Sequence, residues 1–490
     1  MRGSRVTVRT ITIALTFIGI ATDGYAQQPQ APVNIPLNLV PNNQSGELKL
    51  GINVGINGGD ARPYVFDTGS PVFNAVYNEN WWPGFTPDSA TNHAPKSTVM
   101  SPDEGRLMNN AQFCLGGSNP TFCRGYTGNL VEVPQLDFFA TTSDPTPAVR
   151  LSADPGYVVN AAYNYGSPDG SQNGLPFNEN DPPVDTFFFG TFGAGNFLKN
   201  VPIVENPESP PGTPSNYYAG GVLGQTLVSG VTQGYVVAAN GQKNPFSSVN
   251  GPQQIDGINV TVGGQTMQPV TGCNPCVTVG LTPEMQGQFW AATPTDGGNA
   301  GVIPWAVTSP EKFQNPYGGD PISNSSAEAG TIYKTKLTAP GGTKPIISEH
   351  ALGLLDTGTP KLLLTAASLK KAEKISDGCS ISTSDPTEFS CDVKAGTTLE
   401  IDGAAPDGKA IPGLSTTPMT LTQNEGPFEN QPPDANSVTY NASLSNEKTS
   451  NTIGIPFFLQ NSVMYDLDNR VIGYTPFFVT DAWHCQSKLD

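Results

Sequence analysis

The sequence predicts an all-β protein built from two similar lobes, and three observations carry this prediction. Short runs rich in Val, Thr, Tyr and Phe alternate with clusters of Gly, Pro, Asn and Asp, as in β-proteins with long loops. The pattern Asp-Thr-Gly followed by Ser or Thr occurs twice, at 67–70 and 356–359. A chain of 490 residues also exceeds the roughly 250–300 residues that one core holds. We therefore expect an N-terminal lobe at 27–245 and a C-terminal lobe at 246–490.

The first 26 residues have the pattern of a signal peptide. Three arginines precede a short apolar run at 11–21, and the residues at 24–26 are suited to cleavage before Gln27. The apolar run is too short to span a bilayer, although an N-terminal anchor that is never cut is the alternative. We expect an exported protein, periplasmic or secreted, that is not attached to a membrane after cleavage.

The charge balance excludes some classes of partner. The chain has 42 acidic and 24 basic residues, which gives a formal net charge of −18. A charge of this sign disfavours binding to nucleic acid and to anionic membranes. We expect neither partner.

Both tetrads place an aspartate where an apolar strand ends in a tight glycine turn. Asp67 follows the apolar run 64–66, and Asp356 follows 352–355. An ionised carboxylate at the end of a buried strand is costly unless it is paired or shares a proton. One such aspartate is ordinarily a turn residue that bonds its own backbone. Two copies indicate that each half of the molecule contributes one carboxylate to a shared site.

The segments before the tetrads repeat the same plan. Alternating residues at 48–56 lead through Gly58-Gly59 into the strand that ends at Asp67. Residues 331–338 lead through Gly341-Gly342 into the strand that ends at Asp356. This internal repeat supports two duplicated lobes independently of the tetrads.

Three further blocks follow in a definite order: Gly220-Gly221-Val222-Leu223-Gly224, the segment 451–458, and an expected hairpin at 463–474 that turns at Asp468-Asn469. Together with the tetrads, these blocks resemble the pepsin-like aspartic peptidases, in particular exported members of the bacterial type. The resemblance implies a bilobal pepsin-like fold with a central substrate cleft. It also implies that the first and second blocks brace the first and second tetrad, respectively.

The resemblance implies a role for every residue of the tetrads. Asp67 and Asp356 would be the catalytic pair, sharing one proton and activating a water molecule between them. The hydroxyl groups of Ser70 and Thr359 would bond the outer carboxylate oxygens. Thr68 and Thr357 would bond across the junction of the lobes, and Gly69 and Gly358 would permit close backbone approach.

Members of this family also carry a flap, a β-hairpin with a tyrosine that closes over the substrate. The nearest candidate here is Tyr126, within 123–129, although Gly125 and Tyr126 stand in the reverse of the family's order. The tryptophan that the family places seven residues after the first catalytic aspartate is replaced by Asn74. Tyr126 is therefore either the flap tyrosine or an aromatic residue of the hairpin.

The seven cysteines of an exported chain should mostly be paired. Two pairs are close enough in the sequence to form disulfides that each close a loop: Cys114 with Cys123, and Cys379 with Cys391. Cys273 and Cys276 form a C-x-x-C pattern, for which a redox motif or half of a zinc site is the alternative to a local disulfide. There is no second C-x-x-C and the three histidines are scattered, so we expect no metal. Cys485 is left over and could replace one member of the Cys273–Cys276 pair.

We therefore expect an aspartic endopeptidase with an acidic optimum and no cofactor. Its partner would be a polypeptide substrate bound in an extended conformation, with a preference for apolar side chains, and we expect a monomer. The alternative is a catalytically silent binding or inhibitor protein of the same fold. Such proteins usually lose part of a tetrad, whereas both tetrads are intact here.

Overall fold

The computed structural model describes the greater part of both lobes. The described residues are 32–41, 48–88, 94–100, 107–114, 125–166, 182–184, 187–195, 199–200, 218–219, 221–226, 228, 230–239, 260–262, 265–267, 275–290, 302–304, 312–313, 322–323, 331–383, 385–404, 410–415, 419–421, 442–446, 450–459, 461–467 and 471–475. The predicted signal peptide lies outside them. No helix among the described residues is long and apolar enough to cross a membrane.

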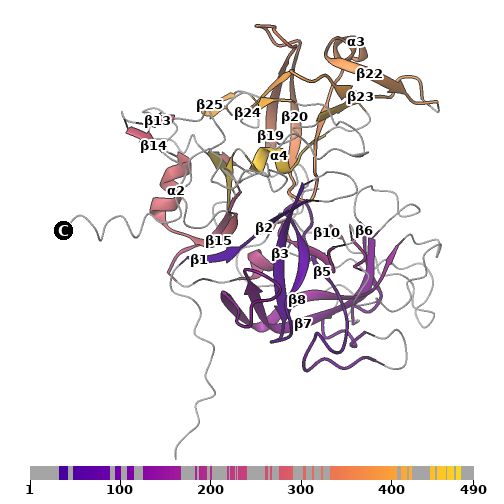
Figure 1. Cartoon of the computed structure of the whole chain (residues 1–490), viewed down its shortest axis with the longest axis vertical. Coiled ribbons are helices and arrows are strands. Elements are labelled where there is room, and N and C mark those ends of the chain that lie inside the picture. Colours follow the sequence, from indigo (N-terminus) through magenta and orange to yellow (C-terminus); the bar gives the residue numbers. More distant parts are fainter. Residues whose placement is uncertain are drawn as a thin grey trace, which may run out of the picture.

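The N-terminal lobe is built on one sheet, which has eight strands within the described residues (Figure 1). In spatial order these are β2 (Asn38–Pro41), β3 (Leu48–Ile56), β4 (Arg62–Asp67), β9 (Gly190–Gly193), β5 (Phe73–Val76), β8 (Val149–Gly166), β7 (Gly125–Phe139) and β6 (Ala111–Cys114). The last four residues of β4, which ends at Asp67, are all buried. The predicted hairpin ahead of Asp67 is therefore present as β3 and β4.

The C-terminal lobe is built on a second sheet, which has ten strands within the described residues. In spatial order these are β22 (Ser376–Ile381), β23 (Phe389–Val393), β27 (Ala442–Ser445), β21 (Leu362–Thr365), β28 (Ser450–Ile453), β20 (Ile347–Leu355), β19 (Thr331–Thr338), β24 (Thr398–Ala404) and β25 (Ala410–Ser415), with β26 (Met419–Thr420) also paired to β24. Here β19 and β20 form the predicted hairpin ahead of Asp356.

The two sheets share an unusual sequence of strand pairings. In the first, β4 is parallel to β9, β9 is antiparallel to β5, and β5 is parallel to β8. In the second, β20 is parallel to β28, β28 is antiparallel to β21, and β21 is parallel to β27. Mixed pairings in the same order on both sides show that the lobes are related by pseudo-symmetry. The predicted fold class, all-β with two similar lobes, is confirmed.

A third sheet lies between the lobes and takes strands from both halves of the chain (Figure 1). In spatial order, its described strands are β1 (Val33–Pro36), β15 (Cys276–Leu281), β12 (Thr232–Ala238), β29 (Ser462–Asp466), β30 (Val471–Thr475) and β16 (Val302–Pro304). The pair β29 and β30 is the expected C-terminal hairpin, whose turn lies outside the described residues. The predicted lobe boundary at 245/246 also lies outside them and stays a prediction.

The remaining elements are short. The helices are α1 (Val222–Gln225), α2 (Pro283–Trp290), α3 (Leu369–Ala372) and α4 (Ile455–Phe458), with a 3-10 turn, η3 (Glu373–Ile375). Three two-stranded ladders are β10 (Lys199–Asn200) with β11 (Tyr218–Ala219), β13 (Val260–Val262) with β14 (Gln265–Met267), and β17 (Lys312–Phe313) with β18 (Ile322–Ser323).

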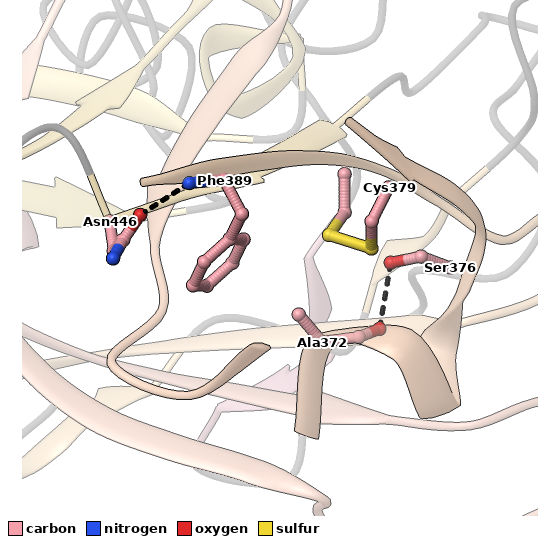
Figure 2. The surroundings of a disulfide bond; sticks show 6 residues. Ala372, Ser376, Cys379, Phe389 and Asn446 are labelled. Carbon is pink, nitrogen blue, oxygen red and sulfur yellow. Dashed lines mark hydrogen bonds between the residues drawn. A yellow bond between two sulfur atoms is a disulfide. The ribbon is translucent and has the colours of Figure 1, made fainter. Parts of the chain in front are cut away.

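One predicted disulfide is present in the C-terminal lobe (Figure 2). Cys379 on β22 and Cys391 on β23 are directly opposite in the antiparallel pair and are joined. In its surroundings the Ser376 hydroxyl donates to Ala372 O, which ties the start of β22 to α3 (Figure 2). The disulfide therefore joins the two strands of an edge hairpin, and the Ser376 hydrogen bond ties this hairpin to the neighbouring helix.

The other cysteine predictions involve residues that the structure describes only in part. Cys276 is disulfide-bonded, but its expected partner Cys273 lies outside the described residues. The same is true of Cys123 and Cys485. The predicted Cys114–Cys123 and Cys273–Cys276 bonds therefore stay predictions.

Candidate active site

Asp67 stands at the end of β4, and its carboxylate is held by the turn that follows. The Gly69 N–H donates to Oδ1 at 2.8 Å, and the Ser70 hydroxyl donates to Oδ2 at 2.7 Å. Both donors come from the same tetrad, because the turn after β4 folds the chain back over its own strand end. One oxygen is thus oriented by a main-chain donor and the other by a hydroxyl group.

Asp356 at the end of β20 has the same arrangement. The Gly358 N–H donates to its Oδ1 at 2.7 Å, and the Thr359 hydroxyl donates to its Oδ2 at 2.6 Å. These distances match those at Asp67 to within 0.1 Å. Two identical turns, supplied by the two lobes, therefore present two carboxylates in equivalent environments.

Thr68 and Thr357 lock the two turns together. The Thr68 N–H donates to Thr357 Oγ1 and the Thr357 N–H donates to Thr68 Oγ1, both at 3.0 Å. Each hydroxyl group in turn donates across the junction, from Thr68 to Leu355 O at 2.8 Å and from Thr357 to Phe66 O at 2.7 Å. All four bonds are buried. The relative position of the two carboxylates is consequently set by backbone atoms of both lobes.

The two glycines place each carboxylate against the opposite turn. A Cβ added to Gly69 would lie 2.4 Å from Asp356 Cγ, and one added to Gly358 would lie 2.5 Å from Asp67 Cγ. Real Cβ atoms do not approach other heavy atoms so closely. Glycine is therefore required at both positions for the carboxylates to meet, as expected from the sequence.

The electrostatics follow from burial and from like charge. Asp67 is only 9% exposed. Burial raises the pKa of its carboxyl group, and the neighbouring charge and hydrogen bond of Asp356 raise this pKa further, whereas the Ser70 and Gly69 donors act in the opposite direction. Two carboxylates in contact cannot both ionise at low cost. The pair therefore retains one proton at pH values where an isolated aspartate is ionised.

One parallel strand on each side braces the two turns. On the C-terminal side, the Asp356 N–H donates to Ile453 O of β28 at 2.9 Å, and α4 follows directly, as the block at 451–458 predicted. On the N-terminal side, β9 has this role, and the Ala194 N–H donates to Asp67 O at 2.8 Å.

The first bracing segment was assigned wrongly from the sequence. The described residues of this block, 221–224, lie on and just before α1, whose N-cap is Gly221, and the parallel partner of β4 is β9 instead. The bracing strand β9 comes earlier in the chain. In the second lobe α4 follows its bracing strand at once, but in the first lobe other residues separate β9 from α1. The apolar-Gly pattern therefore identified the helix that follows the bracing strand, and it did not identify the strand.

Two tyrosines that the sequence did not single out support the site from the central sheet. The rings of Tyr235 on β12 and Tyr465 on β29 stack at 4.8 Å. The Tyr235 hydroxyl donates to Ala194 O next to β9, and the Tyr465 hydroxyl donates to Leu355 O at 3.4 Å. Burial is the main cause of a raised pKa at Tyr465. A neutral aromatic pair thus lies beneath both turns, but nothing in the local sequence marks either residue.

Tyr126 lies inside the N-terminal lobe. Its side chain is fully buried, packs on the Tyr165 ring at 4.8 Å, and shares a hydrogen bond with Thr191 Oγ1 at 2.9 Å. A flap tyrosine needs to face the substrate, so this burial favours the other interpretation, an aromatic residue of the hairpin. Asn74 is also buried and accepts a hydrogen bond from Asn160 Nδ2 at 2.9 Å. The connection between β6 and β7 lies outside the described residues.

No group of three or more His, Cys, Asp or Glu side chains suited to holding a metal ion occurs in the described part of the chain. The two tetrad turns offer two carboxyl groups, one neutral and one charged, held by oriented donors. Such a pair combines a proton donor and a proton acceptor in one place.

The fold and the site define a class: a two-lobed all-β protein with paired aspartates at the junction of its lobes. No protein-family model matches the sequence, and no curated protein sequence matches it. Among solved structures, the chain is similar to an aspartic proteinase from Irpex lacteus, with 11% identity and a TM-score of 0.42, over 92% of this chain and 99% of that one. It is also similar to basic 7S globulin from soybean, with 14% identity and a TM-score of 0.35, over 91% and 97%. Likenesses this distant do not decide what the chain does.

The interlocked threonines lead to a first testable prediction. Thr68→Val removes the hydroxyl group that accepts from Thr357 N–H and donates to Leu355 O. The buried Thr357 N–H then loses its partner, whereas Leu355 O keeps the bond from the Tyr465 hydroxyl group at 3.4 Å. We expect the free energy of unfolding to fall by about 1–3 kcal/mol, the cost of one unsatisfied buried group. Urea denaturation followed by tryptophan fluorescence measures the change.

Two further variants control this measurement. Thr343→Val, at an exposed threonine, should change the free energy of unfolding by less than about 0.5 kcal/mol. The double variant Thr68→Val, Thr357→Val should lose less than the sum of the two single losses, because both act on one network. Unfolding of Thr68→Val at the wild-type urea midpoint would contradict the structural role described above.

Proposed function

We propose that this protein is an aspartic endopeptidase whose catalytic residues are Asp67 and Asp356. The observation that supports the proposal most strongly is the close approach of two carboxyl groups from different lobes, each held by an equivalent pair of donors. A structural role alone does not account for this contact, because burying two like charges together is costly. A function that needs one shared proton does account for it.

The proposed reaction uses the two carboxyl groups in complementary roles. The ionised carboxylate takes a proton from a water molecule, whose oxygen attacks the carbonyl carbon of the scissile peptide bond. The protonated carboxyl group donates its proton to the carbonyl oxygen and stabilises the tetrahedral intermediate. Collapse of this intermediate breaks the C–N bond. The leaving nitrogen takes up the proton that the first carboxyl group had received from water, and a hydroxyl group of the intermediate returns its proton to the second carboxylate. No covalent enzyme intermediate and no cofactor are involved.

The donors around the pair support these roles. Gly69 N–H and Ser70 Oγ on one side, and Gly358 N–H and Thr359 Oγ1 on the other, hold the carboxyl groups before a substrate arrives. Such preorganisation lowers the barrier, since no reorganisation is needed during the reaction. The substrate in this proposal is a polypeptide in an extended conformation, and the enzyme acts as an exported monomer.

Hydrolysis of a denatured, fluorescently labelled protein between pH 2.5 and 8 tests the proposal. The active form of the pair exists only between its two macroscopic pKa values. Hydrolysis should therefore be greatest in acid and should decline as the second proton is lost at higher pH. A metal chelator should have no effect. A complete lack of hydrolysis at every pH would refute the proposal and would favour the alternative of a silent binding protein.

A further inference from the structure

Lys49 is a cation from one lobe that touches the aspartate-bearing turn of the other. It lies on β3, where it pairs with Val40 of β2. Its Nζ donates to Gly358 O at 2.6 Å, although the two residues are 309 positions apart in the sequence. The side chain is partly buried at this contact. Its position therefore depends on the way the two lobes are docked.

Gly358 belongs to the immediate surroundings of the carboxylate pair. Its N–H holds Asp356 Oδ1, and its α-carbon faces the Asp67 carboxyl group so closely that a Cβ would lie 2.5 Å from Cγ. The carbonyl group of the same residue is bound by Lys49. The ammonium group consequently binds a residue that contacts both carboxyl groups of the pair.

Lys49 differs from Lys336, another partly buried lysine, in its partner. Lys336 is paired with Asp402 at 2.6 Å and Glu400 at 3.0 Å, whereas Lys49 forms no ion pair with any described residue. An ammonium group has three donors, and a neutral carbonyl group accepts only one of them here. A partly buried charge without a counter-ion is costly. A carboxylate supplied by a ligand would offset this cost.

We propose that Lys49 is a specificity-determining residue, which binds an acidic side chain of the substrate close to the scissile bond. This inference rests on the proposed endopeptidase function. In its active form the Asp67–Asp356 pair carries one negative charge, which repels an acidic substrate side chain. The Lys49 ammonium group offsets that repulsion on one side of the site. Lys361, two residues after Thr359 in the sequence, carries a charge of the same sign.

The competing explanation is that Lys49 only joins the two lobes, and it predicts a different result. A purely structural contact affects every substrate equally, so its loss would lower kcat/KM by one common factor. A specificity residue acts on the ratio between an acidic substrate and its neutral isostere. Pairs of peptides that differ only by Glu or Gln separate the two explanations.

The experiment measures kcat/KM for such pairs, with the Glu or Gln placed in turn at each of the three positions on either side of the scissile bond. At one position we expect the wild type to favour Glu by about fivefold, as for a partly exposed ion pair. Lys49→Met should abolish this preference, and Lys49→Glu should reverse it. Lys370→Met, at an exposed lysine of α3, makes the same change in net charge and should keep the wild-type ratio.

The pH dependence and a binding assay complete the test. The preference should disappear below about pH 4, where the glutamate of the peptide itself becomes protonated. Fluorescence anisotropy with the same peptides reads out binding when no hydrolysis occurs. Equal affinity for Glu and Gln peptides in the wild type, at every position, would overturn the inference whether or not the protein is active. A Glu preference that Lys49→Met abolishes, without hydrolysis, would support the role of Lys49 and refute the endopeptidase.

Discussion

Replacing either Asp67 or Asp356 by asparagine is expected to reduce hydrolysis about 10⁴-fold, the upper range for the loss of general acid–base catalysis. An amide has the size of a carboxyl group, and its single oxygen can still accept from one of the two donors, but it cannot take up the proton of water. The two losses should not add, because either substitution destroys the pair. The double variant is therefore expected to be no less active than either single variant.

The same variants should change how the stability depends on pH. The pKa of Asp67 is raised in the folded protein, chiefly by burial and then by Asp356, above the value of about 3.9 in an unfolded chain. Between these two values the folded protein keeps a proton that the unfolded chain has released. The free energy of unfolding must then decrease as the pH rises through this interval, by at most about 1.4 kcal/mol per pH unit. Asp67→Asn removes this contribution.

Urea denaturation at several pH values between 3 and 8 measures this difference, and wild type is compared with Asp67→Asn at each pH. The variant should gain stability relative to wild type as the pH rises. Asp385→Asn is the matched control, because Asp385 is exposed and hydrogen bonds from Thr387 lower its pKa; its hydrolysis should be unchanged. Substantial hydrolysis in Asp67→Asn or Asp356→Asn would rule out the proposed catalytic pair.

A single methyl group on either tetrad glycine is expected to inactivate the protein. In Gly69→Ala and Gly358→Ala, the new Cβ would lie 2.4–2.5 Å from the carboxyl carbon of the opposite aspartate. The carboxylate and the turn must move apart, and a displacement of about 1 Å at a reacting centre costs about 100-fold in rate. Forcing extra atoms into this packed junction should also lower the free energy of unfolding by about 1–3 kcal/mol.

Gly378→Ala is the control for these variants. A Cβ at Gly378 would meet no atom within 4 Å, so this variant should keep the wild-type rate and stability. Hydrolysis rates and urea midpoints of the three variants provide the comparison. Wild-type activity in Gly69→Ala or Gly358→Ala would show that the two carboxylates need not meet for the protein to act.

Much of the fold and the core of the site could be predicted from local patterns. Both tetrads lie at the ends of buried strands, each preceded by a hairpin, because apolar alternation and glycine turns specify strands and their ends within a few residues. Two copies of the same pattern predicted two lobes. The pairing of Cys379 with Cys391 was equally local, because the two residues belong to one hairpin.

Other features depended on contacts that no local pattern encodes. The strand that braces Asp67 was assigned to 220–224, but the parallel partner of β4 is β9, since parallel pairing joins segments without a short connecting turn. Tyr126 is buried against Thr191. The position of a strand in the sheet decides which way its side chains face, and the neighbouring Gly125 does not reveal that position.

Local patterns in the chain were sufficient to predict the pair of carboxylates, their donors and the strands that carry them. Their environment depends on folding: the contact of each carboxylate with the opposite glycine, the two stacked tyrosines beneath the turns, and the Lys49 ammonium group on Gly358 O. The two groups of features differ in the range of the forces that set them. Backbone turns and alternation are set by neighbours in the chain, whereas desolvation and charge act between any groups that folding brings together.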